Sequence, residues 1–387
     1  MQNRHFIVVL FLLGLLALLG LGQIAAQETV TPQDLRFALT FLPNIQFSPV
    51  YVMIANGHAA DAGLNLFIEY ADEPIVADMV ANNTIPFGVI SGEQTIMARA
   101  GERPIVYIYE WYQQYPVGIV IPDTTDAETV ADLQDRKIGI PILGGASYSG
   151  LIALLTANEM TEEDVQLEVI GYIAPDAICT GYVEASVIYV NNEPLQIQQR
   201  ANAGNCGDVT GVSVIRVADY VDIVSNGLIT NEETIANNPE LIQAMITAFD
   251  NGLRDVINNP AAAYLISLEY VENLPADEDF YAALEEAAAA QTEFLAETPS
   301  REEIAASREA LLEELSAQFS DETLIQFRVL LETIKLWDVE QLGYTDPASW
   351  ETTLGILEAT DMLPGEVSLE GAYTNDFVPP VAEIPAE

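Results

Sequence analysis

Basic residues are scarce in this chain. Its 387 residues include 13 Lys and Arg against 59 Asp and Glu, which gives a formal net charge of −46 at pH 7. A chain this acidic repels phosphates, so the composition excludes nucleic acid as a general partner. The same excess weakens the electrostatic capture of small anions and favours solubility outside the cell.

Histidine is nearly absent, which limits both metal binding and catalysis. Beyond the N-terminal segment the chain has only His58, whereas a structural zinc site normally needs four nitrogen or sulfur ligands. No Ser/His/Asp or Cys/His set can be assembled without His58, which lies in "NGHAADAG", where surface placement is the default. We therefore expect no metal, no catalytic residue and no cofactor.

A phosphate-binding loop is also missing, although one stretch has its glycine spacing. Gly145 and Gly150 in "GGASYSGLI" are spaced as in such a loop, but Leu151 and Ile152 stand where Lys and Ser/Thr are needed. The stretch still reads as a turn that connects a strand to a helix.

The N-terminus has the pattern of an export signal. Arg4 precedes an uncharged apolar run over residues 6–21, and a small-residue cleavage site follows at 24–26. Residues 1–26 are thus predicted to be a signal peptide or, since the run is about as long as a short membrane span, a retained anchor. The mature protein would be periplasmic or lie on the outer face of the cell membrane.

The two cysteines, Cys179 and Cys206, both follow this segment. In an oxidising compartment an even number of cysteines favours a disulfide, while two unpaired thiols are the alternative. We predict the Cys179–Cys206 bridge.

Strand-like and helix-like segments alternate along the first half of the chain. Residues 34–115 and 116–222 each show this alternation, which predicts two α/β lobes with mostly parallel sheets. From residue 223 to 379 the pattern becomes mostly helical, with Asn-Pro start signals and long Ala-, Glu- and Leu-rich stretches.

Five segments carry a resemblance to a known family: "FLPNIQFSPVYVMIANGHAADAGLNL", "GIPILGGASYSGLIALL", "ASVIYVNNEPLQ", "DIVSNGLITNEETIANNPELI" and "DPASWETTLGILEATDML" with the later "YTNDFVP". The chain resembles the thiamine-pyrimidine-synthase-like (NMT1/THI5-like) solute-binding proteins of ABC importers, and within them the branch proposed to bind riboflavin. The resemblance implies a hinged two-lobe fold of the type II periplasmic-binding-protein kind. It also implies a monomer that closes on a small molecule and delivers it to a membrane permease.

In such a fold the chain crosses between lobes twice, and the sequence suits crossings near 115–116 and 222–223. The helical remainder would then pack on the first lobe. Closure around a ligand about such a hinge is a known kind of motion.

Loops that follow strands supply the candidate ligand groups of the first lobe. In "FLPNIQFSP", Asn44 and Gln46 offer amides and Phe47 an aromatic wall, unless the segment is only a Pro-Asn turn with a core phenylalanine. In "SGEQ", Ser91 suits a helix N-cap, whereas Glu93 can accept hydrogen bonds from a ligand.

The hinge segment "YIYEWYQQYP" concentrates aromatic residues. Some of them must simply pack between the lobes. Trp111, with its neighbour Tyr112, is the best candidate to stack on a flat ligand.

Two loops of the second lobe complete the predicted site. The glycine-serine turn would present backbone and hydroxyl donors at a helix N-terminus, and "VIYVNNEP" would present paired amides that read a heteroaromatic edge. A tight connection and a turn before proline are the plain alternatives. The candidates are Gly145, Ser147, Tyr148, Asn191, Asn192 and Glu193.

None of these loops contains Lys or Arg, which binders of anionic ligands are expected to use. We therefore expect a flat, neutral heteroaromatic vitamin, riboflavin first and a thiamine pyrimidine precursor second. A pyrimidine-synthase-like enzyme is the remaining alternative, which the export signal and the lack of catalytic residues disfavour.

Overall fold

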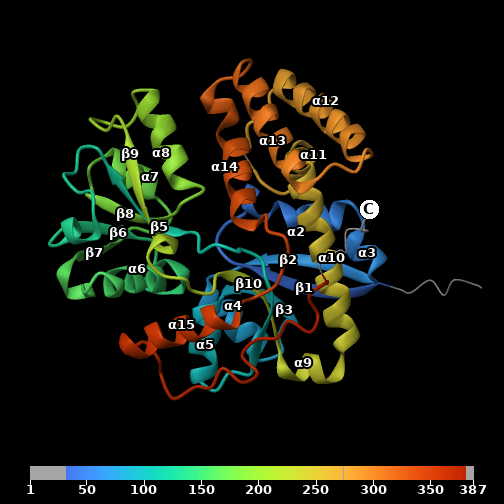
Figure 1. Cartoon of the computed structure of the whole chain (residues 1–387), viewed down its shortest axis with the longest axis horizontal. Coiled ribbons are helices and arrows are strands. Elements are labelled where there is room, and N and C mark those ends of the chain that lie inside the picture. Colours follow the sequence, from blue (N-terminus) through green and yellow to red (C-terminus); the bar gives the residue numbers. More distant parts are fainter. Residues whose placement is uncertain (1–31, 273, 381–387) are drawn as a thin grey trace, which may run out of the picture. The chain divides into compact units, whose positions relative to one another are not determined.

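The computed structural model describes residues 32–272 and 274–380 (Figure 1). The predicted export signal, residues 1–26, lies outside this part of the chain. Among the described residues, no helix has the length and apolar character needed to cross a membrane.

Two five-stranded sheets organise the fold. The first has the order β2-β1-β3-β10-β4 and the second the order β7-β6-β8-β5-β9. The strands of the first sheet are β1 (Gln33–Leu39), β2 (Leu64–Tyr70), β3 (Phe87–Ser91), β4 (Ile105–Glu110) and β10 (Asn226–Asn231). Those of the second are β5 (Val117–Pro122), β6 (Lys137–Ile140), β7 (Gln166–Val169), β8 (Ala185–Tyr189) and β9 (Val212–Arg216). The predicted α/β class is confirmed.

Both sheets are mixed, so the prediction of mostly parallel sheets was incomplete. In the first sheet β10 is antiparallel to β3 and β4, and in the second β5 is antiparallel to β8 and β9. Each of these strands is the first after the chain has passed from one sheet to the other. The passage from β4 to β5 contains no helix, so the βαβ rule that aligns neighbouring strands does not apply to it.

Helices cover both faces of the first sheet, and strands β3, β4 and β10 are therefore buried throughout. One face packs on α2 (Ser48–Ala55) and α10 (Pro239–Asn258), and the other on α4 (Glu73–Ala81), α5 (Gly92–Ala100) and α15 (Pro347–Ala359). Helix α10 buries Ile242, Met245, Ile246, Phe249 and Leu253, which lie on one side at helical spacing.

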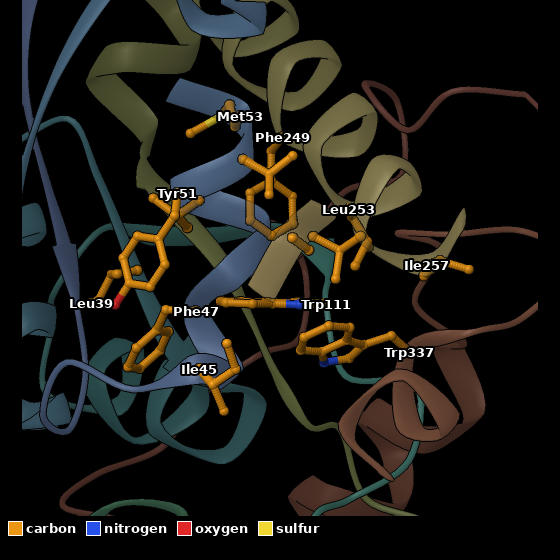
Figure 2. Packing of buried hydrophobic residues seen from close by; sticks show 14 of the residues in the cluster. Leu39, Ile45, Phe47, Tyr51, Met53, Trp111, Phe249, Leu253, Ile257 and Trp337 are labelled. Atoms are coloured by element: carbon orange, nitrogen blue, oxygen red, sulfur yellow. The ribbon is translucent and has the colours of Figure 1, made fainter. Parts of the chain in front are cut away.

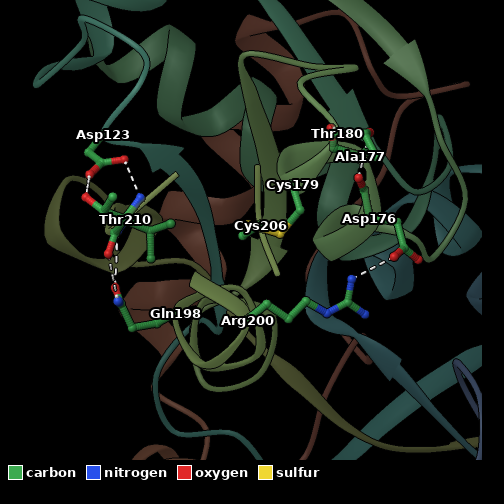
Figure 3. Close-up of a disulfide and its surroundings, with 10 residues drawn as sticks. Asp123, Asp176, Ala177, Cys179, Thr180, Gln198, Arg200, Cys206 and Thr210 are labelled. Atoms are coloured by element: carbon green, nitrogen blue, oxygen red, sulfur yellow. Dashed lines mark hydrogen bonds and ion pairs between the residues drawn. A yellow bond between two sulfur atoms is a disulfide. The ribbon is translucent and has the colours of Figure 1, made fainter. Parts of the chain in front are cut away.

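The second sheet is covered by α6 (Gly145–Ala157) on one face and by α7 (Ala174–Cys179) and α8 (Glu193–Asn202) on the other. Figure 3 shows the bridge between Cys179, at the end of α7, and Cys206, beyond α8, with the two Cα atoms 4.2 Å apart. The two cysteines thus lie paired, in the arrangement predicted from the sequence. The bridge ties α7 to the loop after α8, and an ion pair of 2.6 Å between Arg200 and Asp176 links the two helices themselves.

The helical remainder of the chain belongs largely to the core of the first sheet. It comprises α9 (Glu232–Asn237), α11 (Pro260–Ser267), α12 (Glu278–Leu295), α13 (Arg301–Ser316) and α14 (Asp321–Trp337). Helix α14 ends with Trp337, which Figure 2 shows beside Trp111 and below the residues of α10. Shorter elements are α3 (His58–Asp61) and the 3-10 helices η1 (Ile45–Phe47), η2 (Val130–Leu133), η3 (Glu162–Asp164) and η4 (Val217–Asp219).

Candidate functional site

One cavity is lined by residues of both sheets and of the loops that follow their strands. It encloses about 100 Å³, or about 930 Å³ when the open mouth is included. Its lining consists of Thr40, Phe41, Gln46, Phe47, Asp72, Glu73, Val89, Trp111, Tyr112, Pro141, Ile142, Gly144, Gly145, Ala146, Ser147, Gly171, Tyr172, Ala174, Val187, Ile188, Tyr189, Asn192, Glu193 and Asn226. None of these residues is Lys, Arg or His.

Most of the residues singled out from the sequence meet on this wall. They are Gln46, Phe47, Trp111, Tyr112, Gly145, Ser147, Asn192 and Glu193. They come from four of the five predicted loops, which the two sheets bring together although they are far apart in sequence.

Four predicted residues lie off the wall, namely Asn44, Glu93, Tyr148 and Asn191. Asn44 caps η1 by accepting a hydrogen bond from Gln46 N at 3.0 Å. The hydroxyl of Tyr148 donates to Glu162 of η3. His58, which we expected to be outside any site, lies 2.7 Å from Asp255 through its Nε2.

Asn191, the third of the four, supports the wall from behind. Its Nδ2 donates to Gln46 Oε1 at 2.6 Å and to Thr333 Oγ1 at 2.7 Å. Tyr112 also reaches Gln46 Oε1, at 3.3 Å. Asn191 therefore ties the loop after β8 to η1 and α14 and fixes the position of the Gln46 amide.

Trp111 lines the cavity and is fully buried. Figure 2 shows Phe47, Phe249 and Trp337 around it, with ring centroids at 6.0, 5.0 and 5.7 Å. The ring centroid of Tyr112 lies 5.6 Å away. Because four rings surround it, Trp111 is as much a core residue as a wall residue, and less of its face is open than the sequence suggested.

Aromatic residues that the sequence reasoning missed stand at the mouth. The rings of Phe41 and Tyr172 meet edge to face with centroids 4.7 Å apart, and Tyr172 donates to Asp72 Oδ1 at 3.0 Å. Phe41 follows β1 and Tyr172 follows β7. The rule that ligand groups follow strands applies to both and could have found them.

Glu73 is the most consequential residue that was missed. It is the first residue of α4, shortly after β2, where the sequence "DEP" indicates only the start of a helix. The side chain is 7% exposed, and Oε1 accepts hydrogen bonds from Ser91 N and Asn226 Nδ2, both at 2.9 Å. Oε2 accepts a third, from Ala146 N at 2.6 Å, in the first turn of α6.

This third bond changes the prediction for the glycine-serine turn. We expected the N–H groups at the start of α6 to face a ligand. Ala146 N instead donates to the carboxylate of Glu73, which lies on α4 beside the first sheet. Gly145 permits the approach, because it has φ of 63° and a Cβ there would collide with Glu73 Oε2.

Glu93 lies behind Glu73 rather than on the wall. Ser91 Oγ donates to Glu93 Oε1, and the hydroxyl of Tyr115 lies 3.3 Å from the same oxygen and 2.9 Å from Ala146 O. Burial, reinforced by the charge of Glu73, raises the pKa of Glu93 to about 8, and burial also raises the pKa of Glu73. Glu73 receives three donors and Glu93 Oε2 has no partner among the described residues, so we assign the proton of the pair to Glu93.

Because several carboxyl groups are buried, we predict that the free energy of unfolding falls as the pH rises. Burial raises the pKa of Glu93 to about 8 and those of Glu110 and Glu193 to about 7, so between about pH 5 and pH 8 the folded chain holds protons that the unfolded chain has lost. The urea midpoint should be higher at pH 5.5 than at pH 8, and Glu93→Gln should flatten this slope. A midpoint that rises with pH would contradict the assignment.

Comparisons with known proteins place the chain in context. Residues 44–263 match a family described as NMT1/THI5 like. The riboflavin-binding protein RibY of Chloroflexus aurantiacus is 29% identical over 362 residues, covering 92% of this chain and 88% of the relative. The formylaminopyrimidine-binding protein of Halalkalibacterium halodurans is 23% identical over 269 residues, which cover 68% of this chain and 79% of the relative.

Among solved structures, the alkanesulfonate-binding protein SsuA from Xanthomonas axonopodis pv. citri, bound to MOPS, superposes with a TM-score of 0.60. It is 11% identical, and the match covers 89% of this chain and 99% of that protein. At this identity the likeness concerns the fold alone, and it confirms the predicted periplasmic-binding-protein fold.

Proposed function

The chain belongs to the NMT1/THI5-like family, and from this premise we propose that it is the solute-binding receptor of an ABC importer for riboflavin. It would be exported, take up the vitamin in the cavity between the two sheets and deliver it to a membrane permease. Residues 34–115 and 223–379 would form one lobe and residues 116–222 the other, with closure about the two crossings. It would act as a binding protein and not as an enzyme.

The observation that carries this proposal is the 29% identity to a riboflavin-binding protein along 92% of the chain. The chemistry of the cavity is consistent with it. A flavin is flat, neutral and edged with alternating donors and acceptors. The lining offers rings such as Phe41, Phe47 and Tyr172, amides such as Gln46 and Asn192, and no cationic side chain.

Amides reach the cavity from both sheets, so a ligand held by them would link the two lobes. Gln46 lies on η1 beside the first sheet, and Asn192 follows β8 of the second. Tyr189 also joins the sheets, through a bond of 3.2 Å from its hydroxyl to Asn226 Oδ1.

The size of the cavity favours a second candidate ligand. The enclosed 100 Å³ is well below the roughly 300 to 1,000 Å³ of typical ligand pockets. It suits one small ring, as in the ligand of the formylaminopyrimidine-binding relative. A three-ring flavin would have to occupy the mouth or separate the sheets further, so the pyrimidine remains the alternative ligand.

Replacing Tyr172 tests whether a flavin occupies the mouth. Tyr172→Ala removes the ring that meets Phe41 across the mouth, so riboflavin should dissociate about 2 to 10 times faster, on the scale of one aromatic pair. The measurement is the recovery of riboflavin fluorescence after dilution in a stopped-flow instrument.

Tyr182→Ala is the matched control. Tyr182 is also an exposed tyrosine bonded to a carboxylate, Glu168, but it does not line the cavity. Equal dissociation rates in both variants and the wild type would show that the mouth is not part of the ligand site. No riboflavin binding at all would refute the proposed function.

A further inference from the structure

The carboxylate of Glu73 stands where the cavity could otherwise hold an anion. Helix α6 has 13 residues, and its first turn carries N–H groups with no partner inside the helix. Such a helix end attracts negative charge. Here the negative group is Glu73 Oε2, at 2.6 Å from Ala146 N, and both residues line the cavity.

The surroundings of Glu73 are built to hold a charged carboxylate. Its two oxygens receive three N–H donors, from Ser91, Asn226 and Ala146, which stabilise the charged form. Gly145 adds room for it, since any side chain there would collide with Oε2. The carboxylate is thus held by the first sheet and is directed at the second.

The other acidic residues of the lining lack this arrangement. Asp72 Oδ1 accepts a hydrogen bond from the Tyr172 hydroxyl at the mouth. Glu193, the first residue of α8, accepts one through Oε2 from Tyr189 N at the end of β8. Within the described residues, neither has a hydrogen bond to the N-terminus of α6. Among the acidic residues of the lining, only Glu73 accepts a hydrogen bond from the first turn of α6.

We propose that Glu73 is a specificity-determining residue that bars anionic ligands from the cavity by occupying the N-terminus of α6 with its own carboxylate. Ligand selection then depends on one side chain in addition to the absence of Lys and Arg. This inference rests on the proposed function only in taking the cavity as the ligand site. It holds for a flavin and for a pyrimidine alike.

The test uses methanesulfonate and acetate as probes of the full mature chain at constant ionic strength. Glu73→Ala should bind either anion at least about tenfold more tightly than the wild type does, on the scale of a charge at a partly buried helix terminus. The readouts are the amide resonances of residues 145–147 and a saturable rise in melting temperature. Asp72→Ala is the matched control, because it removes the same charge from the neighbouring residue and leaves the helix end occupied.

Each outcome decides the matter. Anion binding by Glu73→Ala alone supports the proposal, while equal gains in both variants would assign the effect to net charge and overturn it. Absence of binding by a folded Glu73→Ala would also overturn it.

If Glu73→Ala does not fold, the wild type still provides a test. Saturable shifts of its 145–147 amides with millimolar methanesulfonate would show that Glu73 excludes nothing, and unshifted amides support the proposal. A riboflavin titration run in parallel separates the two claims, since it can fail while the anion result stands.

Discussion

Replacing Trp111 with alanine should weaken riboflavin binding by about 1 to 3 kcal/mol, on the scale of aromatic stacking on a flat heterocycle. It should also lower the free energy of unfolding by about 3 to 5 kcal/mol, the cost of truncating a fully buried tryptophan. The same substitution causes both losses, because Trp111 lines the cavity and its ring also packs against Phe249 and Trp337. Isothermal titration gives the first loss, and urea unfolding gives the second.

Trp350→Ala separates the two effects. Trp350 is equally buried, stacks on Tyr373 at 4.7 Å, and belongs to the core on the opposite side of the first sheet. It should reduce stability by a similar amount and leave the affinity of the folded protein unchanged. If both variants lost the same affinity, the effect of Trp111 would be one of folding and not of contact with the ligand.

Removing the disulfide should cost about 3 to 4 kcal/mol of unfolding free energy, because it closes a loop of 27 residues in the unfolded chain. The double variant Cys179→Ser with Cys206→Ser measures this loss by urea unfolding. The wild type in a reducing agent should show the same loss, which controls for the serine side chains. A loss below about 1 kcal/mol, or two free thiols in protein taken from its own compartment, would contradict the bridge.

The two sheets and the loops of the site could be predicted because each rests on a local pattern. Short apolar strands alternate with helices, and ligand groups in such folds follow strands. This rule identified Gln46, Phe47, Asn192 and Glu193, which the fold brings to one cavity wall from loops that are distant in sequence. The prediction of the disulfide rests on the even number of cysteines and on the export pattern.

What could not be predicted depends on contacts between distant parts of the chain. The sequence around Trp111 does not reveal that Phe249 and Trp337 enclose its ring, because those residues reach it from α10 and α14. Nor does a glycine-serine turn reveal that its helix end is occupied by Glu73 from the other sheet. The antiparallel strands β5 and β10 escaped the βα pattern for a related reason, since each follows a passage between the sheets.

The most direct test of the central claim is isothermal titration of the purified mature protein with riboflavin, flavin mononucleotide and formylaminopyrimidine. We predict that riboflavin binds with one site per chain. It should bind at least about tenfold more tightly than the mononucleotide, whose phosphate would enter an acidic cavity without cationic side chains. Heat from formylaminopyrimidine alone, or tighter binding of the mononucleotide than of riboflavin, would contradict this account.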